Sequence, residues 1–485
     1  MRRLNVYFRL IGIPLIVSLL LWCNISYSQT LSGILPDNET WSGTINLTGD
    51  VTVPEGVTLT IEAGTKVIFP AHSDDTAGGN NTSLTELIVN GSLVAVGTEA
   101  DSIHFTSDAL SNAKGDWGGI RAPWGLGTKV FQLKYCLIEY ATFGVQWQVS
   151  VGVQSISISQ CTIQHTSGNG IYVYGEGGSK ASLDIEDNEI LDNSGRGIYC
   201  DVQGSSTQLS GTITGNTIAE NGSNGLYVYT YDNARCDLSI NNNSIYNNSE
   251  YGIRLYSYRT YGTQSQYAVS NNRVYASGVG IYCHMEESHM KVEVTGNEVY
   301  QSSEGIFCRS KYNYTLSAVI SDNEVHDNSS RGIYCYADSG HAYYGWYSQL
   351  YPEITGNRIY NNSGDGINCS RNSSYTIMVP VITLNTVYGN GGRGIYCQAT
   401  AGVNFLYNDV HENMGDGLYV IGGSGTKVHF NNLSGNGGNY ELNNGNSASI
   451  NARFNYWGDL LTEEMEAGGN PKNISRIYDI YDSGS

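Results

Sequence analysis

The sequence predicts an all-β solenoid, a parallel β-helix of about 12 or more coils with three strands in each coil. A glycine followed by Ile, Leu or Val recurs through most of the 485 residues, and most intervals between these glycines are 25 to 28 residues long. A period in that range is typical of stacked coils that share one core. The repeated glycines are Gly119, Gly144, Gly170, Gly197, Gly225, Gly252, Gly280, Gly305, Gly332, Gly366, Gly394 and Gly417.

The pattern inside each unit favours strands over helices. Val, Ile and Tyr recur at every second position and are interrupted by clusters of Asn, Gly and Ser. Period two with such interruptions indicates short strands joined by turns, whereas helical repeats contain longer runs of Leu, Ala, Glu and Lys. One unit, residues 197–224, divides into a strand at GIYCDV, a second near LSGTITG and a third at NTIAEN. Three strands per turn is the coil of a parallel β-helix.

The cysteine of the repeated GIYC unit is predicted to lie in the core. Residues two apart on a strand share a face, so Ile198 and Cys200 point one way and Tyr199 the other. In the remaining units only aliphatic residues replace this cysteine. The column consists of Val173, Cys200, Val228, Leu255, Cys283, Cys308, Cys335, Cys369, Cys397 and Val420. We therefore expect these cysteines to act as small hydrophobic residues.

Disulfides are expected to be few. Side chains in a parallel stack point the same way and meet the angular demands of a disulfide poorly, although a bridge between two adjacent members stays open. Cys136 and Cys161 align with each other at the position that later coils fill with a turn asparagine. They are the pair that we expect to be bridged.

Asparagines recur at two turns of each unit and are expected to form stacked ladders. Asparagine tolerates the left-handed conformation that a sharp turn needs, and stacked amides can bond from coil to coil. The first column is Asn188, Asn216, Asn243, Asn272, Asn297, Asn323, Asn357, Asn385 and Asn408, and the second is Asn193, Asn221, Asn248, Asn328, Asn362, Asn390 and Asn413. A third column before the glycine alternates in charge: Glu304, Arg331, Asp365, Arg393 and Asp416. We interpret all three columns as structural.

The G-I-Y-x(n)-N-x-I/V units over residues 115–440 resemble the right-handed parallel β-helix repeat proteins of the pectate-lyase-like superfamily, in their bacterial secreted or surface type. The segments GDVTVPEGVTLTIEAGTKVIFPA and GSLVAVGTEADSIHFTS resemble opening coils of such proteins, and FNYWGD resembles a unit near their ends. The resemblance implies a right-handed coil, in line with the preference of parallel crossovers. We expect an N-terminal cap with the first coils at residues 29–115, repeats at 116–457 and a C-terminal capping segment at 458–485.

The chain is expected to be exported. Residues 1–28 combine a basic start, an apolar run and small residues before a cleavage point, which is typical of a signal peptide. Removing its Arg2, Arg3 and Arg9 leaves 22 basic residues against 45 acidic ones, a formal charge of −23. Such a surface repels nucleic acid, and no later segment is apolar enough to span a membrane. We expect a secreted or cell-surface protein.

Two aromatic columns are predicted to point outward. One follows the asparagine unit and consists of Tyr246, Tyr275, Tyr300, His326, Tyr360, Tyr388 and His411; the other follows the glycine and includes Tyr199, Tyr227 and Tyr334, with Tyr336 two residues farther along. Stacked rings stabilise a regular solenoid. The second column continues into the longest interval, whose insertion contains Tyr343, Tyr344, Trp346 and Tyr347. Because long aromatic loops on rigid scaffolds often carry binding sites, we expect these eight residues to bind polysaccharide.

The main expectation is a non-catalytic polysaccharide-binding, adhesion or scaffold module. The alternative is a polysaccharide lyase or epimerase acting on uronate-containing glycans, an activity that the resemblance allows. Elimination needs a base and a cation near the carboxylate, and Arg254, His284 and Arg309 lie on successive coils, with Tyr256 or Tyr282 as acid. Hydrolysis needs a carboxylate pair, which we do not find on this face. No motif specifies a metal or cofactor, and Ca²⁺ is an alternative that no specific ligand pattern indicates.

Overall fold

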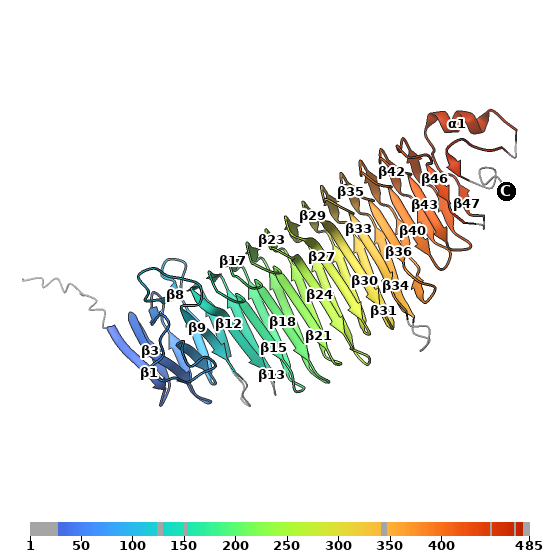
Figure 1. The fold of residues 1–485 in the computed structure, drawn as a ribbon. Coiled ribbons are helices and arrows are strands. Elements are labelled where there is room, and N and C mark those ends of the chain that lie inside the picture. Colours follow the sequence, from blue (N-terminus) through green and yellow to red (C-terminus); the bar gives the residue numbers. More distant parts are fainter. Residues whose placement is uncertain are drawn as a thin grey trace, which may run out of the picture.

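The computed structural model describes residues 28–123, 130–149, 153–340, 347–446, 449–469 and 472–478. Over these residues the chain forms an elongated parallel β-solenoid of about 12 turns, with the first coils at one end and helix α1 (Asp459–Glu466) at the other (Figure 1). Each strand pairs in parallel with the equivalent strand of the next coil, as between β18 (Ile198–Gln203) and β21 (Leu226–Tyr231). The predicted fold class is confirmed.

Three parallel sheets run along the rod. The long-strand sheet contains β6 (Glu86–Val89), β9 (Trp117–Ala122), β12 (Ala141–Val149), β15 (Ile171–Gly175), β18, β21, β24 (Tyr251–Tyr258), β27 (Val279–Glu286), β30 (Glu304–Lys311), β33 (Ile333–Asp338), β36 (Ile367–Arg371), β40 (Ile395–Ala399), β43 (Leu418–Gly422), β46 (Leu442–Asn444) and β48 (Ile477–Tyr478). The short-strand sheet contains β5 (Lys66–Phe69), β8 (Ile103–Ser107), β11 (Cys136–Glu139), β14 (Thr162–Gln164), β17 (Glu189–Leu191), β20 (Thr217–Ala219), β23 (Ser244–Tyr246), β26 (Arg273–Tyr275), β29 (Glu298–Tyr300), β32 (Glu324–His326), β35 (Arg358–Tyr360), β39 (Thr386–Tyr388), β42 (Asp409–His411) and β45 (Asn432–Ser434).

The third sheet contains β2 (Glu39–Trp41), β4 (Thr58–Ile61), β7 (Ser92–Val96), β10 (Val130–Lys134), β13 (Val153–Ser159), β16 (Lys180–Glu186), β19 (Gln208–Thr214), β22 (Arg235–Asn241), β25 (Gln264–Ser270), β28 (His289–Thr295), β31 (Tyr314–Ser321), β34 (Ser348–Thr355), β37 (Thr376–Met378), β38 (Val381–Thr383), β41 (Asn404–Leu406), β44 (Lys427–His429) and β47 (Asn451–Arg453). In the first coils, β1 (Ser28–Ile34) pairs with β3 (Thr44–Val53). The long strand β3 in turn pairs with β5 through its first residues and with β6 through its last residues. No helix among the described residues has the length and apolar character needed to cross a membrane.

The core is built from columns of inward-facing residues, and the GIYC cysteine column is one of them. Cys283 is in register with Cys308, Cys308 with Cys335, and the pairing continues to Cys369 and Cys397. All five side chains are fully buried, and all are free thiols. Burial raises the pKa of the Cys397 thiol well above its usual range, which keeps it protonated and apolar. The predicted core role is confirmed.

The repeated glycine allows neighbouring coils to approach closely. A Cβ added at Gly252 would lie 2.3 Å from Val274 Cγ1 and 2.7 Å from the carbonyl oxygen of Gly280. Contacts this short would force a backbone to shift. The glycine column is therefore required by the spacing of the coils, because every larger side chain would collide with the next turn.

The two asparagine columns form buried ladders. In the first, Asn272 donates from both its backbone nitrogen and Nδ2 to Asn297 Oδ1, each at 2.9 Å, and Nδ2 also donates to the carbonyl of Ile240 at 2.9 Å. The prediction of a left-handed asparagine was wrong. The left-handed residue is the one before it, such as Asn271 with φ of 55°. The turn is made one residue earlier, so that the following amide can point inward and join the two coils.

Cys136 and Cys161 were wrongly expected to be bridged. Both are free thiols at the start of the first ladder, and both are buried. The backbone nitrogen of Cys136 donates to Cys161 Sγ at 3.4 Å, and that of Cys161 donates to Asn188 Oδ1 at 2.9 Å. The Cys161 sulfur thus replaces an amide oxygen as the acceptor in the ladder, a position that a disulfide would distort.

The second ladder and the charged column have defined ends and partners. At the C-terminal end, Asn436 Nδ2 donates to the buried Glu441 Oε2 at 2.7 Å, and Arg476 pairs with the other oxygen of this carboxylate at 2.9 Å. In the charged column, Arg331 lies 2.8 Å from Glu304. Similarly, Arg393 pairs with Asp365. These groups neutralise one another at the turn before the glycine, which agrees with a structural role.

Candidate functional site

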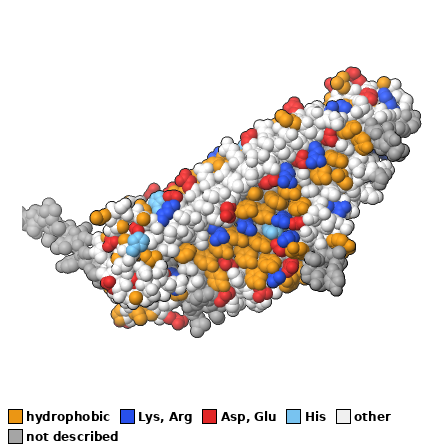
Figure 2. All heavy atoms as spheres, in the orientation of Figure 1, with side chains coloured by type: hydrophobic (Ala, Val, Ile, Leu, Met, Phe, Trp, Pro, Cys, Tyr) orange, Lys and Arg blue, Asp and Glu red, His pale blue; other side chains and the backbone are white. Residues whose placement is uncertain are grey.

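The outward side of the long-strand sheet, which we call the aromatic face, presents two main columns of side chains. Figure 2 shows hydrophobic side chains, a class that includes Tyr, gathered over the middle of this sheet, with Lys, Arg and His side chains among them. The first column is Tyr172, Tyr199, Tyr227, Arg254, Tyr282, Phe307, Tyr334, Asn368, Tyr396 and Tyr419. The second is Tyr174, Asp201, Tyr229, Tyr256, His284, Arg309, Tyr336 and Ser370.

The first column begins as a regular ring stack. Tyr172 and Tyr199 lie 5.1 Å apart between ring centroids with an interplanar angle of 11°, and Tyr199 and Tyr227 lie 5.1 Å apart with 10°. Rings that stack this way cover one another's faces. Tyr199 therefore presents its ring edge and hydroxyl group, which donates to Asp201 Oδ2 at 3.0 Å, whereas Tyr227 is buried.

The stack is broken at Arg254. Its guanidinium carbon lies 4.7 Å from the Tyr227 ring centroid, 4.9 Å from that of Tyr251 and 5.7 Å from that of Tyr256. Arg254 Nε is buried and has no hydrogen-bond partner among the described residues. The Tyr251 ring, which comes from three residues earlier, stacks on Tyr282 at 5.0 Å and takes the place of the missing ring. The result is a cation held between aromatic rings.

A hollow of about 450 Å³ opens beside this cation. It is lined by Glu250, Tyr251, Arg254, Gly278, Val279 and Ser303. The small residues Gly278 and Ser303 create the space. Glu250 Oε2 accepts a hydrogen bond from Asn224 at 3.0 Å, and Arg254 forms no ion pair with any residue in the described ranges. A guanidinium group that faces a hollow and has no ion-pair partner among the described residues is suited to binding an anionic group.

His284 lies on the next coil and is held in its neutral form. Its ring stacks on Tyr256 with 4.6 Å between centroids and an interplanar angle of 3°. Burial, together with the charges of Arg309, Arg254 and Lys311, lowers the pKa of His284 to about 3. Its Nε2 is buried, has no hydrogen-bond partner among the described residues and lies 3.8 Å from Glu286 Oε2. At neutral pH the imidazole is therefore unprotonated, and it lies just beneath the surface of the aromatic face.

The other charges close to His284 are paired. Glu286 accepts hydrogen bonds from the Tyr256 hydroxyl at 3.1 Å and from Lys311 Nζ at 3.0 Å. Arg309 Nε donates to Asp338 Oδ2 at 3.1 Å. Burial and, after it, the Glu286 charge raise the pKa of Tyr256, so that its phenol keeps its proton. The pKa of Tyr282 is also raised, chiefly by burial.

The sequence-predicted residues fall into three groups. Arg254, His284 and Arg309 do meet on neighbouring strands, although Arg254 lies in the first column and the other two lie in the second. Of the eight predicted ligand-binding residues, Tyr199, Tyr227, Tyr334 and Tyr336 lie on the aromatic face. Tyr347 is exposed, with its ring 6.0 Å from that of Tyr375. Tyr343, Tyr344 and Trp346 lie outside the described residues.

Sequence reasoning missed Arg196 and Tyr251. Both precede the repeated glycine, at the same position as the alternating charges Glu304 and Arg331. In the coils before Glu304, the residues at this position are Arg196, Asn224, Tyr251 and Val279. The charges do not alternate in these coils. The loss of alternation was the available signal, because an arginine without an acidic neighbour in its column is free to meet a ligand.

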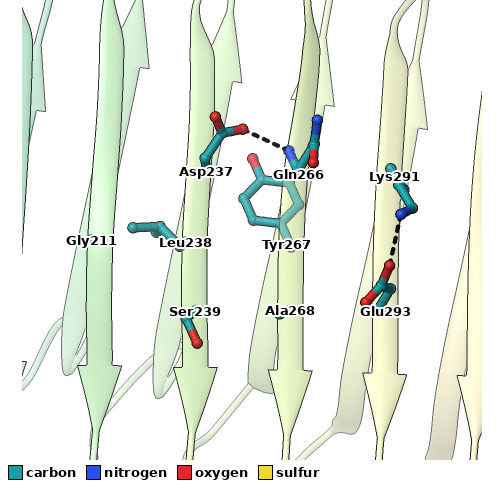
Figure 3. A pocket seen from close by; sticks show the side chains of 9 residues that line it. All are labelled: Gly211, Asp237, Leu238, Ser239, Gln266, Tyr267, Ala268, Lys291 and Glu293. Carbon is teal, nitrogen blue, oxygen red and sulfur yellow. Dashed lines mark hydrogen bonds and ion pairs between the residues drawn. The ribbon is translucent and has the colours of Figure 1, made fainter.

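A second hollow, of about 280 Å³, lies on the third sheet (Figure 3). Its charged lining residues are occupied: Lys291 pairs with Glu293 at 2.7 Å, and Asp237 pairs with Arg235 at 2.6 Å. Asp237 also accepts the backbone nitrogen of Gln266 at 3.1 Å. This hollow offers no free charge. Within the described ranges, moreover, no three His, Cys, Asp or Glu side chains converge to hold a metal ion.

The comparisons with known proteins agree with this architecture. Residues 97–211, 202–345 and 346–433 match the model of the right-handed beta-helix region, and residues 33–127 match the pectate-lyase-like beta-helix domain. The chain therefore belongs to the right-handed β-helix family. A search of curated proteins found no match.

The solved structures similar to this chain include two kinds of epimerase. A variant of the periplasmic alginate epimerase AlgG is 14% identical, with 84% of this chain and 77% of that chain covered and a TM-score of 0.35. The A-module of the mannuronan C-5 epimerase AlgE6 of Azotobacter vinelandii is 12% identical, with 86% and 89% covered and a TM-score of 0.35.

Proposed function

We propose that the protein binds an acidic polysaccharide along the aromatic face. The observation that carries this proposal is Arg254, a guanidinium group without an ion pair among the described residues, held between the rings of Tyr227 and Tyr251 beside an open hollow. Carboxylate is the natural partner of such a group. The hydroxyl and amide groups around it suit the hydroxyls of a sugar, and the family is compatible with such a ligand.

Location supports a ligand of this kind. The N-terminal segment has the character of a signal peptide, so we place the mature protein outside the cytoplasm, where such polymers are found. The overall charge of the chain is negative, but the face concentrates Arg196, Arg254, Arg309 and Lys311 among its acidic residues. The attraction is therefore local, and it should weaken as salt is added.

Retention on immobilised polysaccharides tests the proposal. Wild-type protein should be retained by polygalacturonate or alginate and pass through a neutral glucan, and Arg254→Ala should reduce the affinity about tenfold, which corresponds to about 1.4 kcal/mol. Arg273→Ala is the matched control, because Arg273 also lies over tyrosine rings but sits on the short-strand sheet and pairs with Glu298. Equal retention of the Arg254 variant and the wild type would reject the site.

The second candidate function is proton transfer at a uronate, as a polysaccharide lyase or epimerase. His284 favours it, because an unprotonated imidazole with a free Nε2 lies next to the cation that would hold the carboxylate. In this reaction His284 takes the proton from the carbon that bears the carboxylate, and Arg254 stabilises the charge that develops on the carboxyl oxygens. An anion bound at Arg254 raises the imidazole pKa toward the range of a useful base.

Two products can follow from the same carbanion-like intermediate. If the bond to the neighbouring glycosidic oxygen breaks, the electron pair forms a carbon–carbon double bond and the leaving oxygen takes a proton, for which the Tyr256 or Tyr282 hydroxyl is the available donor. If a proton returns to the opposite face of the same carbon, the sugar is epimerised. Both products require that the first proton is lost.

Two readouts together test this step. In deuterated buffer, an epimerised polyuronate should gain deuterium at the acidic carbon, as measured by nuclear magnetic resonance, whereas elimination leaves no hydrogen there and yields an unsaturated uronate that absorbs ultraviolet light. His284→Gln should abolish either signal while retention stays at the wild-type level. Retention with neither deuterium nor unsaturated uronate in the wild type would leave a binding protein and remove the lyase and the epimerase together.

A further inference from the structure

The binding face contains a second guanidinium group with the same surroundings as Arg254. Arg196 lies just before β18, with its guanidinium carbon 4.4 Å from the Tyr199 ring centroid and 5.1 Å from that of Tyr227. Its Nε is buried without a hydrogen-bond partner, and Arg196 forms no ion pair with the residues that the structure describes. Arg196 and Arg254 thus contact the same tyrosine ring.

The two cations are separated by one intervening coil. Arg196 belongs to the coil of β18 and Arg254 to that of β24, so they lie two strand spacings apart, about 10 Å. In the coil between them the equivalent positions hold Asn224 and Tyr227. Asn224 is uncharged and donates to Glu250, and Tyr227 is 7% exposed. These two cations are therefore two coils apart.

From this spacing we infer that the polysaccharide runs along the solenoid axis and presents one acidic group to the face at every second sugar residue, to Arg196 and to Arg254. The inference rests on the proposed function. An extended glycan advances by roughly one strand spacing with each pyranose, so sugars and coils stay in step. The sugar between the two cations faces Tyr227 and Tyr229, where a buried carboxylate would lose its hydration without gaining a partner.

The charges around the two cations favour this register. Asp201 lies on the same coil as Arg196, in the second column, and its Oδ1 and Oδ2 accept hydrogen bonds from Gln203 and Tyr199. Its charge discourages an anion on the Tyr229 side of the face. An acidic group is therefore guided away from the second column, toward Arg196 in the column before the glycine and Arg254 in the first column.

Chain length and two arginine variants test the inference. The probes are oligogalacturonates of two to six residues, with affinities measured by calorimetry. For the wild type, trimers and longer oligomers, which can reach both cations, should bind at least tenfold more tightly than the dimer. Arg196→Ala should remove this gain with length, Arg196→Lys should restore part of it, and Asn224→Arg, which adds a cation in the intervening coil, should give no tenfold gain.

The outcomes separate this inference from the proposed function. If Arg254→Ala weakens binding but Arg196→Ala has no effect on oligomers of any length, the two-coil register is wrong and the proposed function stands. If the dimer binds as tightly as the hexamer, the register is wrong as well. If no acidic glycan binds the wild type, both fail. Thermal melts of the variants check that each is folded, and Arg273→Ala serves again as the control.

Discussion

The two aromatic columns of this molecule have the same spacing and different consequences. On the short-strand sheet, the rings of Tyr246, Tyr275, Tyr300, His326, Tyr360, Tyr388 and His411 form one unbroken stack, with centroids 4.8 to 5.3 Å apart and interplanar angles from 2° to 10°. On the aromatic face, the corresponding stack is broken by Arg254, and His284 and Arg309 follow beside it.

The comparison shows that the rings of a regular stack satisfy one another and leave no face open to a ligand. Each ring covers the faces of its neighbours, so that the stack stabilises the rod and leaves only edges to solvent. Where the stack is broken, a cation takes the place of a ring, a hollow opens, and polar groups lose their partners. The short-strand column therefore stabilises the solenoid, and the breaks in the aromatic face are the places where chemistry can occur.

Repairing the break should have the largest effect. Arg254→Tyr restores a ring between Tyr227 and Tyr282 and removes the free cation, so we expect the affinity for acidic polysaccharide to fall at least tenfold while the melting temperature stays the same or rises. Retention assays and thermal melts measure the two quantities. Undiminished retention would show that the break has no functional role.

Stability on the aromatic face should depend on pH through His284. Its pKa falls from 6.5 to about 3 on folding, so above pH 6.5 the residue contributes no pH dependence. Below pH 6.5 the imidazole is protonated in the unfolded state but not in the folded state. The free energy of unfolding therefore falls by about 1.4 kcal/mol per pH unit down to about pH 3.

Denaturant unfolding of the wild type and of His284→Gln between pH 7 and pH 5 isolates this effect. The difference in stability between the two proteins should change by about 2 kcal/mol over that range, because the wild type alone loses the contribution. Parallel pH profiles would contradict the assignment of a neutral, buried imidazole.

Breaking the regular stack should affect stability and leave binding unchanged. Tyr300→Ala removes ring contacts to Tyr275 at 4.8 Å and to His326 at 5.0 Å. The expected loss is about 1–3 kcal/mol, measured by denaturant unfolding. The equivalent position in β20 is Ala219, so the backbone accepts an alanine there. A change in polysaccharide retention would show that the two columns do not differ as described.

The smallest effect is expected in the core beneath both columns. Cys335→Val should change the free energy of unfolding by less than about 1.5 kcal/mol, because the same core column already contains valine at Val173 and Val228. Thiol titration should find the nine cysteines of the described residues free after unfolding without reductant. A thiol count lower by two would indicate a disulfide.

The features that recur in every coil could be predicted from the sequence. The cysteine column, the glycine column and both asparagine ladders follow from substitutions between coils, because each coil reports on the next. The left-handed turn residue was assigned one position too late, since stacked amides and left-handed turns both favour asparagine. The hollow beside Arg254 could not be predicted, because it depends on Gly278, on Ser303 and on the direction of the Tyr251 ring.

The carboxylate of Glu441 has a consequence for the behaviour of the molecule in concentrated solution. Each ladder asparagine offers donors to the following coil, so a ladder that stopped at an asparagine would present unsatisfied donors to a second molecule. Asn436 donates instead to Glu441, a side chain that only accepts hydrogen bonds when it is ionised, and Arg476 then pairs with it. This ladder thus closes on itself, which opposes end-to-end growth into fibrils.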